Sequence, residues 1–377
     1  MLILAAVLAI FVYGIIAAML GTILPDISKR FSLSPKQNGQ IAMAQAIGLM
    51  VGSFFVGPLI DTQGKKTGLV LGLVLIAVAL LGLRSAKGFG SVAAMLLLLG
   101  IGGGIVVTGG NALAGDIHIG RLSTAGVYNL LNLFFGLGGL VTPLVAARVF
   151  RNNSPRLLAF AAVLTAATLA VNAIAPMPAP AGAVAFQASA VTGLLGNVTL
   201  LLLSLLLFLY VACEVGVWNW LVRHLIAQGV PQAQALTVLS LGFALGLLLG
   251  RVAVSQVLSG VSPQNVLLAS SVLMAVTTFV MLQSQSKTVA WFLVFLAGLA
   301  MAPVFPTTLA VVGTRFPQLV ATATGIAVTA GWLGLVVSSP IIGGVAGEDP
   351  KRLKKALLVL PAFSVLMIVV NLILRAQ

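Results

Sequence analysis

The sequence predicts an all-α membrane protein with twelve transmembrane helices, arranged as two pseudo-symmetric bundles of six. Three observations lead to this fold class. The 377 residues are 60% hydrophobic and only 7% charged, and the mean hydropathy of +1.17 lies far outside the range of soluble globular domains. Apolar runs of about 18 residues or more, long enough to cross about 30 Å of hydrocarbon, recur along the whole chain. The third observation is an internal repeat.

The apolar runs define the twelve predicted helices and leave no soluble domain between them. The 41 glycines favour helices over a β-barrel, because they recur at small-residue spacings such as Gly48 with Gly52. The first run is too long for a signal peptide and is assigned to the first helix. The predicted helices occupy residues 2–24, 37–60, 67–84, 91–113, 125–149, 155–175, 197–223, 233–257, 265–283, 288–312, 322–345 and 355–374.

The internal repeat relates the two halves of the chain. A shift of 197 residues places Tyr13 on Tyr210 and Pro143 on Pro340, and a shift of 194 places two glycines of the second helix on two of the eighth. The uncharged, proline-containing stretch between the halves is a natural linker. We therefore predict an N-terminal bundle over 1–175, a linker over 176–196 and a C-terminal bundle over 197–377. Such a plan is typical of a transporter with its substrate site near the bilayer midplane.

Composition argues against several other classes of protein. The formal net charge of +14 comes from basic residues scattered singly over short loops, so no nucleic-acid partner is expected. His118 and His224 lack a second ligand at metal spacing, so no metal site is expected. Gly102 to Gly104 are followed by no Walker lysine, which argues against an ATP-driven pump. We expect no enzyme activity and no cofactor other than a coupling proton. The expected partners are a small-molecule substrate and the lipid bilayer, with the chain as a monomer.

The short loop between the second and third predicted helices reads GPLIDTQGKK and carries Gly57, Asp61, Gly64, Lys65 and Lys66. Gly57 permits close helix packing, and Gly64 permits a tight turn before the lysines. The Asp61 carboxylate is suited to face a helix N-terminus or a basic partner. The alternative interpretation is a solvated turn between two spans.

This loop resembles the motif between helices 2 and 3 of the major facilitator superfamily. Further stretches, LNLFFGLGGLVTPL, YVACEVGVWNW, GLLLGR and MAPVFPTTL, are similar to its fucose permease-like branch, the fucose-galactose-glucose proton symporters. The resemblance implies the major facilitator fold, alternating access in the inner membrane, and a gating role for the loop residues. It does not carry over the coupling scheme of that branch's fucose transporter, because the acidic residues of its helices 1 and 4 are absent here.

The orientation of the chain receives two opposite indications. The resemblance places the loop between helices 2 and 3 in the cytoplasm, with both termini on the same side. The loops of that side carry six of the 20 Lys and Arg residues and the opposite side carries fourteen, which favours the inverse orientation. We give the motif more weight, because it ties the sequence to a gating role.

Further gating candidates lie near the predicted ends of helices 4 and 8. Asp116 lies at the predicted end of helix 4 with Arg121 nearby, and either joins Asp61 in a charge network or caps its helix. Arg251 lies just before the end of helix 8, where it can pair with a helix C-terminus or with a carboxylate.

Glu214 is an acidic residue in the middle of a predicted membrane span. An ionised acid at a helix centre costs about 2.5–3.5 kcal/mol, so this carboxyl is expected to be protonated, paired or in a watery cavity. A carboxyl that can be neutral or ionised is what a proton-coupling group requires. The alternative is a structural carboxyl held by neighbouring hydroxyl or backbone groups.

Aromatic and amide side chains near Glu214 suggest a sugar site. Trp218 shares the face of Glu214 at a spacing of four, and Asn219 flanks it. Sugars are recognised by paired hydrogen bonds and by stacking on aromatic rings. Interfacial anchoring of the tryptophans, and hydrogen bonds that join helices, are the competing interpretations. The other candidate substrate-binding residues are Gln45, Asn111, Asn129, Asn132, Tyr210, Thr307 and Trp332.

The predicted function is secondary active transport, most simply proton-coupled symport of a neutral monosaccharide with Glu214 as the titrating group. The alternative is a proton-coupled exporter of hydrophobic compounds or other metabolites on the same fold, which one carboxyl and an aromatic cavity would also serve.

Overall fold

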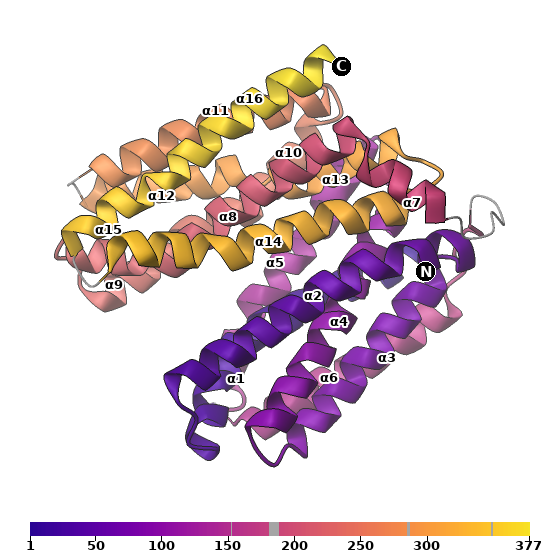
Figure 1. Cartoon of the computed structure of the whole chain (residues 1–377), viewed down its shortest axis with the longest axis horizontal. Helices are drawn as coiled ribbons and strands as arrows, with labels where there is room; N and C mark the ends of the chain where they lie inside the picture. The colour runs from indigo at the N-terminus through magenta and orange to yellow at the C-terminus, as the bar shows by residue number, and fades with distance from the viewer. Residues whose placement is uncertain (152, 181–187, 285–286, 348–349) are drawn as a thin grey trace. The chain divides into compact units, whose positions relative to one another are not determined.

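The structure is a computed structural model that describes the chain except for residues 152, 181–187, 285–286 and 348–349 (Figure 1). Twelve helices of the described residues are long and apolar enough to cross a membrane, as the sequence predicts. The spans are formed by α1 (Leu2–Arg30), α2 (Pro35–Gln63), α3 (Lys65–Arg84), α4 (Phe89–Ala114), α5 (Thr124–Arg148), α6 (Ser154–Ile174), α8 (Val198–Ala227), α9 (Gln232–Thr237) with η1 (Val238–Ala244) and α10 (Leu245–Val257), α11 (Pro263–Gln283), α12 (Lys287–Met301) with α13 (Val304–Arg315), α14 (Val320–Ala346), and α15 (Pro350–Leu357) with α16 (Val359–Ala376).

Three predicted helices are interrupted in the structure. The eighth span contains a π-helical segment, η1, between α9 and α10. The tenth is broken between α12 and α13 at Pro303, which lacks a backbone N–H to continue the helical hydrogen bonds. The twelfth begins with the short helix α15, and α16 follows after Leu358. A further short helix, α7 (Ala188–Leu195), lies within the predicted linker.

The described chain divides into two compact units. The first unit comprises Met1–His118, Leu131–Leu195 and Val312–Thr329, and the second comprises Ile119–Leu130, Gly196–Val311 and Ala330–Gln377. Each unit therefore consists of most of one half of the chain and a short segment of the other half. This segment is Val312–Thr329, with the end of α13 and the start of α14, for the first unit, and Ile119–Leu130, with the start of α5, for the second. The boundaries at 1–175, 176–196 and 197–377 stay a prediction.

The same close packing of two helices occurs within each unit, at positions that differ by the 194-residue shift of the internal repeat. In the first unit, a methyl group on Gly52 of α2 would lie 2.1 Å from the carbonyl oxygen of Ile101 on α4. In the second unit, one on Gly246 of α10 would lie 2.3 Å from the carbonyl oxygen of Phe295 on α12. Gly246 follows Gly52 by 194 residues, and Phe295 follows Ile101 by the same number. The small residues at these positions let the backbones touch in equivalent ways, as expected for a duplicated six-helix plan.

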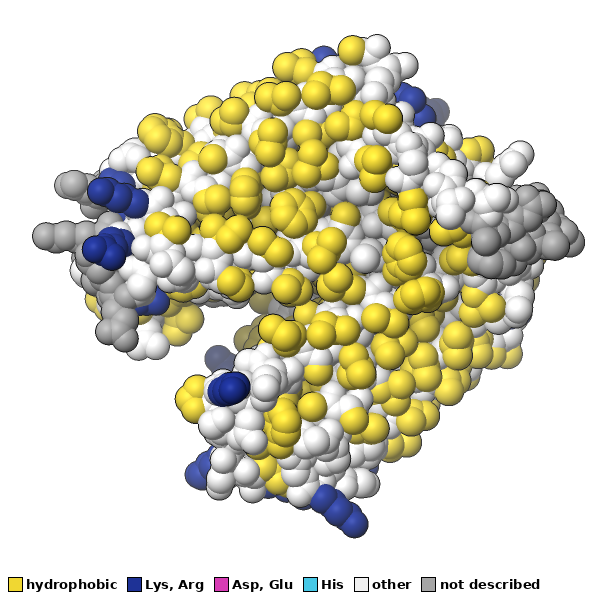
Figure 2. All heavy atoms as spheres, viewed as in Figure 1, with side chains coloured by type: hydrophobic (Ala, Val, Ile, Leu, Met, Phe, Trp, Pro, Cys, Tyr) yellow, Lys and Arg dark blue, Asp and Glu magenta, His cyan; other side chains and the backbone are white. Residues whose placement is uncertain are grey.

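The outer faces of the helices are apolar, as a lipid environment requires. Large hydrophobic side chains are exposed, for example Phe55 and Val163, each 69% exposed. Figure 2 shows hydrophobic side chains over much of the face that it draws. In water an apolar surface of this extent would be unfavourable, whereas in lipid it costs nothing. The chain is therefore a multi-pass membrane protein.

Candidate functional site

The loop motif joins α2 to α3 through a single residue. Gly64 adopts φ +93°, a conformation that residues with a side chain rarely take, and α3 begins directly at Lys65. This turn places Asp61 in the last turn of α2 and the two lysines in the first turn of α3. The charged residues of the motif thus lie close together at one end of the first unit.

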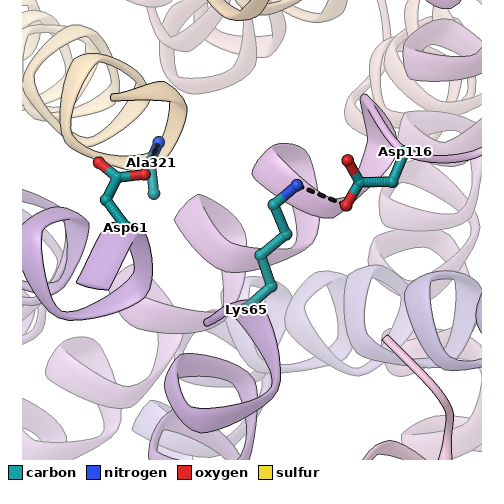
Figure 3. A network of polar contacts seen from close by, with 4 residues as sticks. All are labelled: Asp61, Lys65, Asp116 and Ala321. Atoms are coloured by element: carbon teal, nitrogen blue, oxygen red, sulfur yellow. Dashed lines mark hydrogen bonds and ion pairs between the residues drawn. The ribbon is translucent and has the colours of Figure 1, made fainter. Parts of the chain in front are cut away.

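Asp61 caps the first turn of α14 from 260 residues away in the sequence. Its Oδ1 accepts a hydrogen bond of 2.9 Å from the Ala321 N–H, and its Oδ2 accepts bonds of 2.8 and 2.6 Å from the N–H and hydroxyl of Thr322. Figure 3 shows the carboxylate pointing at this helix start. The first N–H groups of a helix have no partner within it, and its dipole favours a negative charge there. Asp61 satisfies both requirements.

Gly57 lies one turn before Asp61 and allows α14 to approach α2. A methyl group on Gly57 would lie 2.4 Å from the Cα of Thr322 and 2.8 Å from the Ala321 carbonyl oxygen. An apolar cluster supports this approach and consists of Val56, Ile60, Ile105, Ala112 and Ala321. The hydrogen bonds of Asp61 therefore depend on a glycine, because only backbone contact brings the α14 start within reach.

Substitution of Gly57 by alanine is expected to destabilise the first unit by about 1–3 kcal/mol, because backbone atoms of α14 must move to admit the methyl group. The same change at Gly39, also in α2, is the matched control. Nothing lies within 4 Å of a methyl group at Gly39, so alanine there should be neutral or slightly stabilising. The fraction of monodisperse protein left after heating, measured by size-exclusion chromatography, checks the prediction. Equal losses for the two variants would contradict it.

The two lysines of the motif bind different partners. Lys65 forms an ion pair with Asp116, just beyond the end of α4, and the two side chains are 20% and 24% exposed (Figure 3). Lys66 donates a hydrogen bond of 3.1 Å to the Ala173 carbonyl at the end of α6. The two predictions for Asp116, near Arg121 in the sequence, are a charge network with Asp61 and a cap on its own helix. Asp116 pairs instead with Lys65, while Asp61 binds α14 and Arg121 belongs to the second unit.

In the second unit, three ionisable or hydroxyl-bearing side chains of α8 and α10 lie together. The Tyr210 hydroxyl is within electrostatic reach of both the Glu214 carboxyl and the Arg251 guanidinium. Tyr210 is fully buried and Arg251 is 4% exposed, whereas Glu214 is half-buried. Tyr210 and Glu214 share a face of α8 because they are four residues apart. Sequence reasoning assigned Arg251 to a gate and missed this association. The sequence signal for this association is Arg251 itself, because a cation within a membrane span needs a polar or anionic partner from another span.

Aromatic and amide groups of α8 continue from Glu214 toward the end of the helix. The Trp218 ring, 39% exposed, meets Phe243 of η1 edge-on with ring centroids 5.4 Å apart. The Asn219 amide donates a hydrogen bond of 2.8 Å to the Ser339 hydroxyl of α14. Trp332 of α14 is 9% exposed. These groups belong to the second unit, as Glu214 does.

The neutral amides of α5 bind separate partners. Asn129 donates 2.9 Å hydrogen bonds to the Thr307 hydroxyl and to the Ala125 carbonyl, all within the second unit. Asn132 donates a 2.9 Å bond to the Asn111 oxygen, within the first unit. Asn129 and Asn132 are three residues apart and so lie on one side of α5. The boundary between the units crosses α5 between them, and their hydrogen-bond partners belong to different units.

Gln45 and Asn111 complete the candidate substrate residues. Both are buried in the first unit, at 5% and 1% exposure. The Asn111 amide also donates a 2.8 Å bond to the Val107 carbonyl of its own helix. Asn111 is thus hydrogen-bonded both within α4 and to Asn132 of α5, which is what the structural interpretation of this residue requires.

Comparison with known proteins identifies the family. The sequence pattern of the Major Facilitator Superfamily matches residues 6–372. The chain belongs to this superfamily. It is accordingly a membrane transporter and not an enzyme.

Individual relatives of this major facilitator protein are distant. A TsgA homolog from Citrobacter koseri is 22% identical over 343 residues, which cover 89% of this chain and 85% of that protein. The fucose:proton symporter FucP of E. coli has the same fold, with a TM-score of 0.85 at 16% identity, covering 99% of this chain and 98% of FucP. The proton:xylose symporter XylE matches with a TM-score of 0.79 at 15% identity, covering 98% and 94%. At these identities the structural matches establish the fold.

Proposed function

We propose that this chain is a proton-coupled symporter of a neutral monosaccharide that works by alternating access in the inner membrane, with Glu214 as the proton carrier. The observation that carries the proposal is the grouping of Glu214, Tyr210 and Arg251 inside the second unit. An acid within a span is costly unless it is protonated or stabilised by other groups. Here the Arg251 guanidinium and the Tyr210 hydroxyl are the groups that would stabilise the ionised Glu214 carboxylate.

The grouping provides two alternative states of the Glu214 carboxyl. When the carboxyl is ionised, it would interact with the Tyr210 hydroxyl, which also interacts with the Arg251 guanidinium, and attraction among the three groups would hold α8 and α10 together. When the carboxyl is protonated, this attraction is lost and the helices are free to rearrange. Binding of a proton would thus be linked to a conformational change, which is what a coupled transporter requires.

The choice of a sugar as substrate rests on the neighbourhood of Glu214. Trp218 offers an indole ring that is partly exposed, and Asn219 offers an amide on the adjacent position of α8. Aromatic faces and amides together suit the apolar face and the hydroxyls of a pyranose. Two proteins of the same fold, FucP and XylE, are proton symporters of fucose and xylose.

Substrate-induced proton movement tests the proposal. Addition of a transported monosaccharide to lightly buffered proteoliposomes should make the external medium more alkaline, because each sugar enters with a proton. Fucose, xylose, glucose and galactose form the first panel, and protein-free liposomes and a protonophore are the controls. External acidification on addition of an amphiphile, with no response to any sugar, would instead favour the exporter. Sugar uptake without proton movement would overturn the coupling.

A further inference from the structure

The short helix α15 is strongly amphipathic. Leu353, Ala356 and Leu357 are buried at 5% exposure or less, while Lys355 is exposed and Lys354 is half-buried. Its buried side packs against the rest of the second unit, of which it is part. Its lysines lie in the first turns of the twelfth span, the end at which such a helix is expected to meet the membrane surface. Amphipathic helices with basic polar faces characteristically lie in the headgroup region of a bilayer.

The end of α8 adds further basic and aromatic groups next to α15. Arg223 donates a hydrogen bond of 3.2 Å to the Gly347 carbonyl, just before α15, and its guanidinium lies 5.5 Å from the centre of the Trp220 ring. His224 is only 3% exposed, and its Nε2 has no hydrogen-bond partner among the described residues. The Lys354 ammonium is within electrostatic reach of this imidazole. A buried polar atom without a partner normally signals a missing ligand or water.

The charge of this region is positive. The sequence from 348 to 355 contains four basic residues and two acidic ones, the acidic pair at positions outside the described residues. Arg223 adds another cation from α8. Figure 2 shows Lys and Arg side chains gathered around α15.

We propose that the junction of α8 and α15 binds the headgroup of an anionic phospholipid. Lys354 and Lys355 would contact the phosphate, and Arg223 would stay stacked on Trp220 at the edge of the site. Exposed apolar side chains near the end of α14, Ile341 at 41% and Val345 at 54% exposure, would offer a surface for the acyl chains.

The physical basis is the attraction of basic residues near the membrane surface to anionic lipid. Lysine suits this position because its long apolar stem lies along the hydrophobic surface while the ammonium reaches the phosphate. A phospholipid fits better than a free anion, since the cations lie at the surface level of a span with exposed apolar side chains beside them. The proposal holds for either orientation of the chain, because the lipid is defined by its charge and not by its leaflet.

Lipid titration of the purified full chain in detergent tests this site. Dioleoyl phosphatidylglycerol and dioleoyl phosphatidylcholine are added separately, and bound lipid is counted by native mass spectrometry while thermal stabilisation gives the apparent affinity. The wild type should bind phosphatidylglycerol at least tenfold more tightly than phosphatidylcholine. The double variant Lys354→Gln and Lys355→Gln should lose about 30-fold in affinity for phosphatidylglycerol, about fivefold for each lysine, and keep its affinity for phosphatidylcholine.

Two further variants make the result specific. The double variant Lys36→Gln and Lys87→Gln removes two exposed lysines from the first unit, and it should bind phosphatidylglycerol within twofold of the wild type. The charge-preserving variant Lys354→Arg and Lys355→Arg should also bind it, which separates loss of charge from misfolding. Unchanged binding by the glutamine variant, or an equal loss in the first-unit control, would overturn the site. Displacement of the lipid by millimolar inorganic phosphate would show a small-anion site instead.

Discussion

Replacement of Glu214 by glutamine is expected to abolish proton-driven accumulation of sugar while leaving sugar binding and exchange intact. Glutamine has nearly the same shape but cannot take up or release a proton. With one proton per neutral sugar, a gradient of one pH unit supports an accumulation of about tenfold in the wild type. The variant should only equilibrate its substrate, at a ratio of about one. Accumulation in proteoliposomes with an imposed pH gradient, beside counterflow without one, measures both activities.

The outcome separates coupling from structure. Counterflow should persist in Glu214→Gln, since exchange of bound sugar needs no net proton transfer. Glu214→Asp, which retains a titratable group, should recover part of the accumulation. Undiminished accumulation in Glu214→Gln for every sugar that the wild type takes up would rule out Glu214 as the proton carrier. Loss of counterflow together with accumulation would instead indicate that the carboxyl is structural.

Substitution of Asp61 by asparagine is expected to have the second large effect. Three donors at the start of α14 bind the Asp61 carboxylate at 2.6–2.9 Å. Hydrogen bonds to a charged acceptor contribute about 1.5–3 kcal/mol each. An asparagine keeps one oxygen but turns an N–H₂ group toward N–H donors, and it also removes the charge that the helix dipole favours. We expect the conformation in which Asp61 caps α14 to lose about 2–4 kcal/mol of stability. The transport rate should be at least tenfold lower.

Asp26→Asn is the matched control, because Asp26 is an exposed carboxylate near the end of α1. It should leave both transport and thermal stability unchanged. Initial rates of counterflow and the midpoint of heat-induced aggregation measure the two effects. If Asp61→Asn transports and resists heating as well as Asp26→Asn does, the cap on α14 has no functional role.

Much of the fold could be predicted because each span carries its own signal. A run of apolar residues of sufficient length must cross the bilayer as a helix, whatever its neighbours are, since its backbone groups find no other partners in lipid. The twelve predicted helices therefore match the twelve spans, with ends that differ by a few residues. The breaks were not predicted, although Pro303 stands at one of them, because hydropathy does not respond to backbone geometry.

Less of the candidate site could be predicted, because it depends on partners distant in sequence. The loop motif predicts that the Asp61 carboxylate faces a helix N-terminus or a basic partner, but it does not identify that partner. The hydrogen-bond donors belong to Ala321 and Thr322 of the eleventh span. Asn129 and Asn132 are both candidate substrate-binding residues of one helix, yet the boundary between the units passes between them and their hydrogen-bond partners differ. Spacing along one helix describes a face but not what that face contacts.

The sequence by itself determined that this is a twelve-helix membrane transporter with an internal repeat, a glycine-bearing loop motif and a carboxyl in the middle of a span. These are properties of local composition and periodicity. They determine structure directly, because an apolar segment in a bilayer must form a helix to satisfy its backbone hydrogen bonds. The tertiary structure decided that Asp61 caps α14 and that Lys65 pairs with Asp116. It also decided that the Tyr210 hydroxyl lies within electrostatic reach of both Glu214 and Arg251. Such pairings depend on how helices pack, and packing is set by the shapes of side chains from distant segments, which no single segment contains.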